Sequence, residues 1–184
     1  MLGSSFDEVL LAARARGEWA WARIYDDLAP AVIGYFRARG AQDPEDLLGE
    51  TFLQLVRDLP DFQGDEGRFR SWVFTIAHHR LLDGSRKRAR RPAVPLAPED
   101  LGEALGHGDA EEEALGMLGS GRVRELLASL SPDQQDVLLL RVMADLSVDD
   151  IARILGKRPG AIKALQRRGL ARLRREISSK AVPL

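Results

Sequence analysis

The chain has 184 residues, with 27 basic and 28 acidic side chains, no cysteine and a formal net charge of −1. Its hydrophobic content of 45% and charged content of 30% are typical of a folded globular protein with one ordinary domain or two small ones. The lack of cysteine excludes disulfides, zinc–thiolate sites and thiol redox sensing. There is no signal-peptide pattern, and no run approaches the roughly eighteen apolar residues of a membrane span. We therefore expect a cytoplasmic protein.

Two helices are predicted near the N-terminus, over residues 6–16 and 18–38, with a break at Gly17. Apolar residues recur in both at the spacing of one helix face, and Pro30 is expected to kink the second helix. Gly40 ends this unit. We expect these apolar side chains to form a core rather than a cofactor site: Phe6, Val9, Leu10, Ala13, Trp21, Ile24, Tyr25, Leu28, Val32, Tyr35 and Phe36.

The next helix is predicted to begin at DPEDLLGETFLQLV, with Asp43 as its N-cap and Pro44 at its first position. The opposite face from its apolar stripe carries Asp46, Glu50 and Gln54, spaced i, i+4 and i+8. This polar ridge is either a solvated face or a docking surface for a basic partner helix, and the helix alone does not separate the two readings. The apolar stripe consists of Leu48, Phe52, Leu55 and Leu59.

A loop is predicted over residues 61–68, DFQGDEGR, followed by a helix over 69–82 that is apolar around most of its circumference. Five basic residues then fall within positions 86–91. This combination suits binding of single-stranded nucleic acid, because bases stack on aromatic rings while Lys and Arg follow the backbone. Core packing is the alternative for the aromatic residues, and we favour it for Trp72 and Val73.

Residues 92–119 differ in composition from both flanking segments. Three prolines within seven positions precede a glycine-bearing stretch with seven acidic residues and no Lys or Arg. Such a segment is typical of a flexible acidic linker. The chain is therefore predicted to be all-α, with two small helical domains at residues 1–91 and 120–184 joined by this linker.

Residues 131–177 are predicted to form three short helices that contain a helix-turn-helix. Gly156 is expected to adopt the left-handed conformation that ends the middle helix, and Pro159 is expected to begin the next one. Two serines each have a polar residue three positions later, which is the capping-box spacing: Ser131 with Gln134, and Ser147 with Asp150.

The helix that begins at Pro159 is predicted to bind DNA. Nine basic residues and no acidic one lie between positions 151 and 175. The second helix of such a motif normally enters the major groove, where small residues let its backbone approach the bases and long basic side chains reach phosphates. The alternative is a solvated basic face. The predicted buried face consists of Ile162, Leu165, Gly169 and Leu173.

No catalytic, cofactor or metal site is expected. His79 and Asp83 are four residues apart, but His78 points about 100° away from His79 on a helix and no third ligand is evident. No nucleophile, base and orienting acid form a recognisable set, and there is no phosphate-binding glycine loop. We therefore predict that the protein is not an enzyme.

The order of these segments resembles that of the extracytoplasmic-function (ECF) group of RNA polymerase sigma factors. The resemblance covers residues 18–177 and is most specific at DPEDLLGETFLQLV and at LSVDDIARILGKRPGAIKALQRRGLARLR. The first is similar to the family's polymerase-docking helix, and the second to its promoter-reading helix-turn-helix. FRSWVFTIAHHRLLD, between them, is also characteristic in its position.

The resemblance implies a factor that binds core RNA polymerase and promoter DNA and leaves the chemistry to the polymerase. It implies contacts to the β′ coiled coil and the β flap, and a restraining anti-sigma protein. The β′ contact falls on Asp46, Glu50 and Gln54. Reading of the −35 element falls on Arg141, Arg158, Lys163, Ala164, Arg167 and Arg168. Recognition of the −10 element, with capture of an unstacked base in the loop, falls on Phe62, Gly64, Phe69, Trp72, His79, Arg80, Arg86, Lys87 and Arg88.

Two other classes of protein remain as alternatives at this point. A helix-turn-helix regulator could dimerise or sense a ligand through its N-terminal helices, and would bind a palindromic site without the polymerase. A pure interaction module, such as an antagonist of another regulator, would leave the nine unopposed basic residues without a role.

Overall fold

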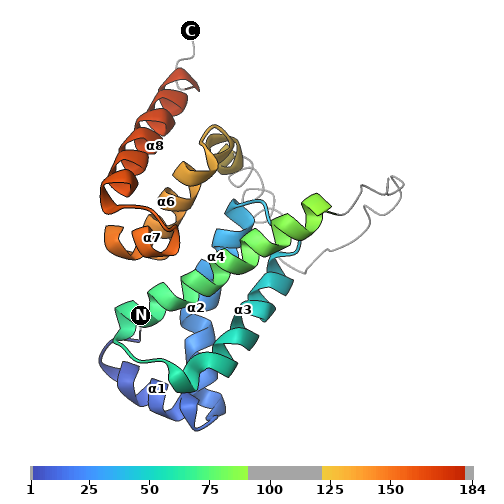
Figure 1. Cartoon of the computed structure of the whole chain (residues 1–184), viewed down its shortest axis with the longest axis vertical. Coiled ribbons are helices and arrows are strands. Elements are labelled where there is room, and N and C mark those ends of the chain that lie inside the picture. Colours follow the sequence, from blue (N-terminus) through green and yellow to red (C-terminus); the bar gives the residue numbers. More distant parts are fainter. Residues whose placement is uncertain (1, 91–121, 181–184) are drawn as a thin grey trace, which may run out of the picture.

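The computed structural model describes residues 2–90 and 122–180, in which every regular element is helical (Figure 1). The predicted all-α class is thus confirmed. The N-terminal unit comprises η1 (Gly3–Ser5), α1 (Phe6–Arg14), α2 (Glu18–Ala38), α3 (Pro44–Asp58), η2 (Leu59–Asp61) and α4 (Glu66–Arg90). The C-terminal unit comprises helical residues 122–128, α6 (Pro132–Val142), α7 (Val148–Ile154) and α8 (Pro159–Lys180). The predicted linker, residues 92–119, lies outside the described residues, so the domain boundaries stay a prediction.

Helices α1 and α2 pack through the apolar faces that their spacing predicted. Most of the expected core residues are buried, including Phe36, which is fully buried. Trp21 is half-buried, and Tyr25 is 47% exposed, with its ring against Phe52 and the centroids 4.8 Å apart. The turn between the helices places Arg16 at φ 62° and closes with a hydrogen bond from Gly17 N to Ala12 O of 2.9 Å.

Helix α3 begins at Pro44 as predicted, although the side chain of Asp43 makes no capping hydrogen bond. Its buried face packs against α4, which is buried on several sides from Phe69 to Leu81. The predicted excess of apolar surface on α4 has a structural explanation. One side of α4 packs against α2 and α3, and another packs against α7 of the C-terminal unit.

The helix-turn-helix forms as the sequence indicated. Both capping boxes are present, with Gln134 N donating to Ser131 Oγ at 3.3 Å and Asp150 N donating to Ser147 Oγ at 3.1 Å. Gly156 has φ 62°, and Pro159 begins α8. The predicted inner face of α8 packs on α6: a Cβ at Gly169 would lie 3.0 Å from Leu138 Cδ1, so a side chain there would require Leu138 to shift by a few tenths of an ångström.

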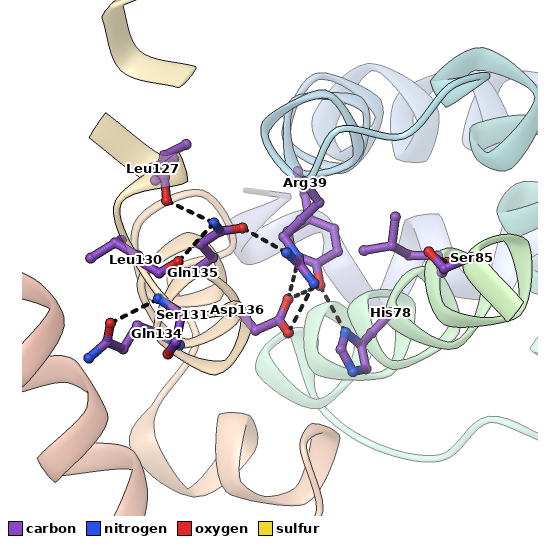
Figure 2. Close-up of polar contacts among 11 residues, drawn as sticks. Arg39, His78, Ser85, Leu127, Leu130, Ser131, Gln134, Gln135 and Asp136 are labelled. Atoms are coloured by element: carbon purple, nitrogen blue, oxygen red, sulfur yellow. Dashed lines mark hydrogen bonds and ion pairs between the residues drawn. The ribbon is translucent and has the colours of Figure 1, made fainter. Parts of the chain in front are cut away.

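The two units pack directly against each other, which the sequence analysis did not predict. A polar cluster joins α2, α4 and α6 at this contact (Figure 2). The Tyr35 hydroxyl donates to Asp136 Oδ1 at 3.0 Å and lies 2.8 Å from His78 Nδ1. Arg39 Nε lies 2.7 Å from Asp136 Oδ1 without hydrogen-bond alignment, and Arg39 Nη1 donates to Gln135 Oε1 at 2.7 Å. The buried carboxylate therefore has a cationic partner and a hydroxyl donor, as a buried charge requires.

Burial sets the protonation states in this cluster. It lowers the pKa of His78, with a further contribution from His79, so the imidazole is neutral at pH 7. Burial and the Asp136 carboxylate raise the pKa of Tyr35, which keeps its phenol protonated. Because the single hydroxyl hydrogen goes to Asp136, His78 Nδ1 acts as the donor to the Tyr35 oxygen.

A second group of contacts closes the other side of the interface. Arg70 Nε donates to the Ala144 carbonyl at 2.6 Å, and Arg70 Nη1 lies 3.7 Å from Asp27 Oδ2. The Met143 side chain lies over Gly34, where an added Cβ would be 2.3 Å from Met143 Cε. Any larger residue at position 34 would therefore force the two units apart or displace Met143.

Candidate polymerase and nucleic-acid interfaces

The outward face of α8 carries the basic residues predicted to read DNA. Arg158, Lys163, Arg167 and Arg168 are exposed, and Ala164 is half-buried between them. Among the residues that the structure describes, none of these four cations has a carboxylate within ion-pair distance. Such a surface attracts phosphates, and no carboxylate of the described residues competes for it.

Arg141, predicted to contact phosphate, also has a structural role. Its Nη1 donates to the Leu146 carbonyl at 2.6 Å, next to the N-cap Ser147 of α7. The side chain is exposed, so the guanidinium both holds the segment before the helix-turn-helix and faces solvent.

The polar ridge of α3 is accessible. Asp46 is exposed, Glu50 and Gln54 are partly exposed, and a Cβ at Gly49 would meet nothing within 4 Å. Because Gly49 has no side chain, a partner helix can approach the backbone of α3 closely beside Glu50.

Arg80 links the ridge of α3 to the basic surface of α4. Its Nη2 donates to Gln54 Oε1 at 2.7 Å, and its Nη1 lies 3.6 Å from Glu50 Oε2. From the family resemblance, Arg80 is predicted to contact DNA, and Glu50 and Gln54 are predicted to contact the polymerase. The structure brings these two predicted surfaces into contact.

The basic end of α4 faces a depression of about 580 Å³ between α3 and α4. His79 is exposed at its edge, and Arg86 also lines it while pairing with Asp83 at 3.2 Å. Lys87 and Arg88 lie near the end of α4, but their side chains are outside the part of the chain that the structure describes.

The loop before α4 is supported by an aromatic cluster. Phe62 and Trp72 stack with centroids 5.0 Å apart and planes inclined by 19°. Gly64 has φ 153°, and a Cβ there would lie 2.9 Å from the Arg68 side chain, so this position requires glycine. Phe69 is only 2% exposed. Its predicted part in base capture is thus limited to supporting Phe62 and Trp72 from below.

The described residues contain no group of three His, Asp or Glu side chains arranged to hold a metal ion. Within the same residues, no helix combines the length and apolar character that crossing a membrane requires.

The residues of the contact between the units are those that sequence reasoning missed. Tyr35 was predicted to be core, and His78 was placed on the apolar helix and rejected as a metal ligand; Arg39 and Asp136 were not singled out. One signal was available, because Asp136 immediately precedes the apolar run Val137–Leu140 of α6. A carboxylate at the edge of a buried face indicates a buried partner. The partner itself, about a hundred positions away, follows only from the tertiary structure.

Two family profiles match the chain. The profile of sigma-70 region 2 matches residues 24–91, and that of sigma-70 region 4 matches residues 120–173. The first corresponds to α2–α4 and the second to the unit with the helix-turn-helix. Together they cover more than half of the chain.

Curated relatives are similar over most of this length. The ECF RNA polymerase sigma factor BldN of Streptomyces coelicolor is 32% identical over 95% of the chain, which spans 66% of BldN, just under two thirds. ShbA of Streptomyces griseus is 35% identical over 79% of the chain and 81% of its own length. SigD of Mycobacterium tuberculosis is 32% identical over 96% of the chain and 86% of its own length.

Solved structures show the same fold. CnrH in complex with the cytosolic domain of CnrY has a TM-score of 0.68 at 20% identity, covering 94% of this chain and 97% of CnrH. The sigma factor RpoE in complex with the anti-sigma factor NepR, from Bartonella quintana, has a TM-score of 0.62 at 22% identity, covering 85% and 96%.

The matched regions and the exposed basic α8 define a promoter-recognition protein of the sigma-70 type. The chain belongs to the ECF group of RNA polymerase sigma factors. The predicted resemblance is thus confirmed. The two alternative classes, a ligand-sensing regulator and an interaction module, are set aside because the chain belongs to this family.

Proposed function

We propose that this sigma factor binds core RNA polymerase through α3, reads two promoter elements with its two units, and directs transcription initiation without catalysing a reaction itself. One observation carries the proposal. The chain has an exposed acidic ridge on α3 and an exposed basic helix α8 with no acid between positions 151 and 175. These two surfaces suit a basic protein partner and DNA, respectively. Such a factor acts in the cytoplasm.

The proposed docking surface for the polymerase β′ coiled coil is the ridge of Asp46, Glu50 and Gln54. Its support is the ridge's exposure and the open spot at Gly49. A second contact, between the C-terminal unit and the β flap, follows from family membership, and we assign no residues to it.

The proposed −35 contacts are those of α8, with Arg141 and Arg158 on phosphates. Lys163, Arg167 and Arg168 project from the helix on the side away from buried Ile162. This geometry suits entry into the major groove, with the half-buried Ala164 allowing close approach to base edges.

The proposed −10 site consists of the loop from Phe62 to Glu66 and the basic surface of α4. Phe62 and Trp72 are half-buried, so their stacked rings have an accessible edge beside which an unstacked base can lie. His79, Arg80 and Arg86 follow along α4 and suit the backbone of the opened strand, together with Lys87 and Arg88.

A restraining anti-sigma protein is the second proposed partner. RpoE, which has a similar fold, is known in complex with the anti-sigma factor NepR. In this chain, an apolar groove of about 900 Å³ lies between α2 and the C-terminal unit. Its lining includes the apolar residues Leu127, Val142 and Leu173 and the basic residues Arg37 and Arg124. Its chemistry suits an amphipathic helix with acidic flanks.

The test is transcription in vitro from genomic DNA with purified core polymerase, with and without the protein. We expect new, discrete start sites only when the chain is added. The free protein should bind the same promoters weakly, because two small modules gain from each other only when the polymerase fixes their spacing. Nanomolar promoter binding by the free chain would contradict this proposal, and so would an unchanged transcript pattern.

A further inference from the structure

Residues 2–14, which comprise η1 and helix α1, lie outside the region 2 match, which begins at residue 24, yet they contact the proposed −10 loop at both ends. At the far end, the Glu66 carboxylate accepts hydrogen bonds from Leu2 N and Gly3 N, the latter at 3.1 Å. At the near end, Arg14 Nη2 donates to the Phe62 carbonyl.

The packing of α1 reinforces this attachment. Leu2, Phe6 and Val9 are buried, and the Phe6 ring lies 5.7 Å from Phe69 beneath the loop. The indole of Trp21 donates to the Ala13 carbonyl at 3.1 Å and ties the end of α1 to α2. The position of α1 is thus fixed relative to the loop.

This arrangement creates a pocket of about 310 Å³ beside the loop. Five apolar residues line it, Ala13, Trp21, Val56, Leu59 and Pro60, and the other lining residues are three arginines, Arg14, Arg16 and Arg57. Arg14 belongs to both structures, since it lines the pocket and also bonds to Phe62.

The charge in this pocket is unbalanced. No Asp or Glu lines it, and none of its three arginines makes an ion pair within the described parts of the chain. Three cations grouped on a partly apolar surface repel one another, and an anion between them relieves that repulsion. Guanidinium groups suit a phosphate in particular, because their planar fork can donate two parallel hydrogen bonds to its oxygens.

We propose that Arg14, Arg16 and Arg57 form a phosphate-binding pocket for the backbone of the strand whose base enters the 62–66 loop. The proposal rests on the proposed −10 function of that loop. It adds a contact made by α1, a segment that the region 2 match does not include. The pocket directly adjoins the loop through Arg14, so a strand that leaves the loop on this side meets it next.

The test uses the reconstituted holoenzyme and a forked promoter that it selects from a random pool. Single phosphates of the displaced strand are replaced in turn by neutral methylphosphonates, and affinity is measured for each. We expect one or two positions beside the captured base at which the wild type loses roughly three- to ten-fold in affinity. Arg57→Gln and Arg16→Asn should bind the unmodified promoter with this lower affinity. Methylphosphonates at the same one or two positions should cause no further loss in these variants. Asn suits position 16 because it tolerates positive φ.

Arg23→Gln is the matched control, since Arg23 is exposed on α2 and does not line the pocket. It should keep the wild-type pattern of sensitive phosphates. Arg57→Gln should also reduce the slope of log affinity against log salt by about 0.7, the value for one single-strand phosphate contact, and Arg23→Gln should not. Identical methylphosphonate patterns in wild type and Arg57→Gln would overturn the proposal.

Two further outcomes are distinguishable. If the wild-type holoenzyme gives no promoter-dependent transcription, the proposed function is wrong, and the pocket proposal that rests on it is wrong as well. A calorimetric titration of the full chain with inorganic pyrophosphate tests whether a free polyphosphate is the ligand instead. We expect no binding below millimolar concentrations. Tight binding that is lost in Arg57→Gln would overturn the assignment to the DNA strand.

Discussion

The two basic surfaces of this sigma factor differ in how their charge is balanced. On α8, Lys163, Arg167 and Arg168 project into solvent, with no acidic residue from position 151 to 175. On α4, Arg80 is already engaged by Glu50 and Gln54 of α3, and Arg86 by Asp83. The basic residues of α8 can therefore bind phosphates directly, whereas Arg80 and Arg86 of α4 must first release the side chains that they contact.

This difference suggests how docking and promoter opening are coupled. If the polymerase β′ coiled coil takes over Glu50 and Gln54, Arg80 loses its partners within the chain and becomes available to DNA. Binding of one ligand then favours the other, and the coupling is reciprocal because it is a free energy shared by two sites. The proposed −35 helix, α8, has no such ion pair among the described residues.

The largest expected effect comes from reversing the charge at the centre of the α3 ridge. Glu50→Arg places a cation where a basic partner should bind and also repels Arg80 within the chain. We expect loss of co-purification with core polymerase, at least about thirty-fold in affinity, since breaking a desolvated charge pair costs about 2–5 kcal/mol. Circular dichroism should show unchanged helix content, because residue 50 is only partly buried. Intact co-purification of this variant would contradict the docking assignment.

The next effect tests the unopposed surface. In holoenzyme, Arg167→Gln with Arg168→Gln should weaken promoter binding by roughly ten- to a hundred-fold and lower the salt slope by about 1–2, because each phosphate contact releases about 0.9 counterions. Polymerase binding should stay as in the wild type. Arg153→Gln is a matched control: that arginine lies in α7 and is already paired with Asp150. Equal losses in the control would mean that overall charge, not α8, determines the affinity.

A smaller effect sharpens the comparison between the surfaces. Glu50→Gln removes the ion pair with Arg80 and keeps the size of the side chain. Because both groups are about a third exposed, the pair contributes at most about 1 kcal/mol, so we expect a few-fold gain in the affinity of the free chain for single-stranded DNA. The same change together with Arg80→Gln should cancel the gain. If the single variant gains nothing, Arg80 is not restrained by the ridge.

The sequence was sufficient for features set by local chemistry. The capping boxes at Ser131 and Ser147, the left-handed Gly156 and the start of α8 at Pro159 all depend on residues within a few positions of one another. They could therefore be predicted from spacing alone. The inner face of α8 followed in the same way from its helical period.

Features that join distant segments could not be predicted in this way. The pairing of Arg80 with Glu50 depends on how α3 and α4 are rotated about their axes relative to each other. The apolar periodicity of a helix sets this rotation only to within about one residue position. The contact of Asp136 with Tyr35 joins residues 101 positions apart and exists only once the two units pack. Likewise, the attachment of the segment before α1 to the start of α4 rests on Leu2 and Glu66, which share no sequence pattern.

The smallest expected effect concerns the contact between the units, which must open if the two basic surfaces are to reach separate promoter elements. Burial lowers the pKa of His78 below its ordinary value of 6.5, with Tyr35, Asp136, Arg39 and the neighbouring imidazole of His79 around it. Once the units separate, His78 is exposed and its pKa returns towards 6.5. The separated state therefore binds more protons just below pH 6.5, so the closed contact weakens as pH falls through that window and is at full strength above it.

Because the chain has no cysteine, Ala22→Cys and Ala171→Cys, both at exposed positions, allow one label on each unit. Energy transfer between the two labels should fall from pH 7.5 to 5.5 in the otherwise wild-type chain. It should stay flat with His78→Gln, whose amide can still donate to the Tyr35 oxygen but does not titrate. The comparison isolates the histidine from all other titratable groups, because these are the same in both proteins. A pH response of equal size in both proteins would show that it arises from a group other than His78.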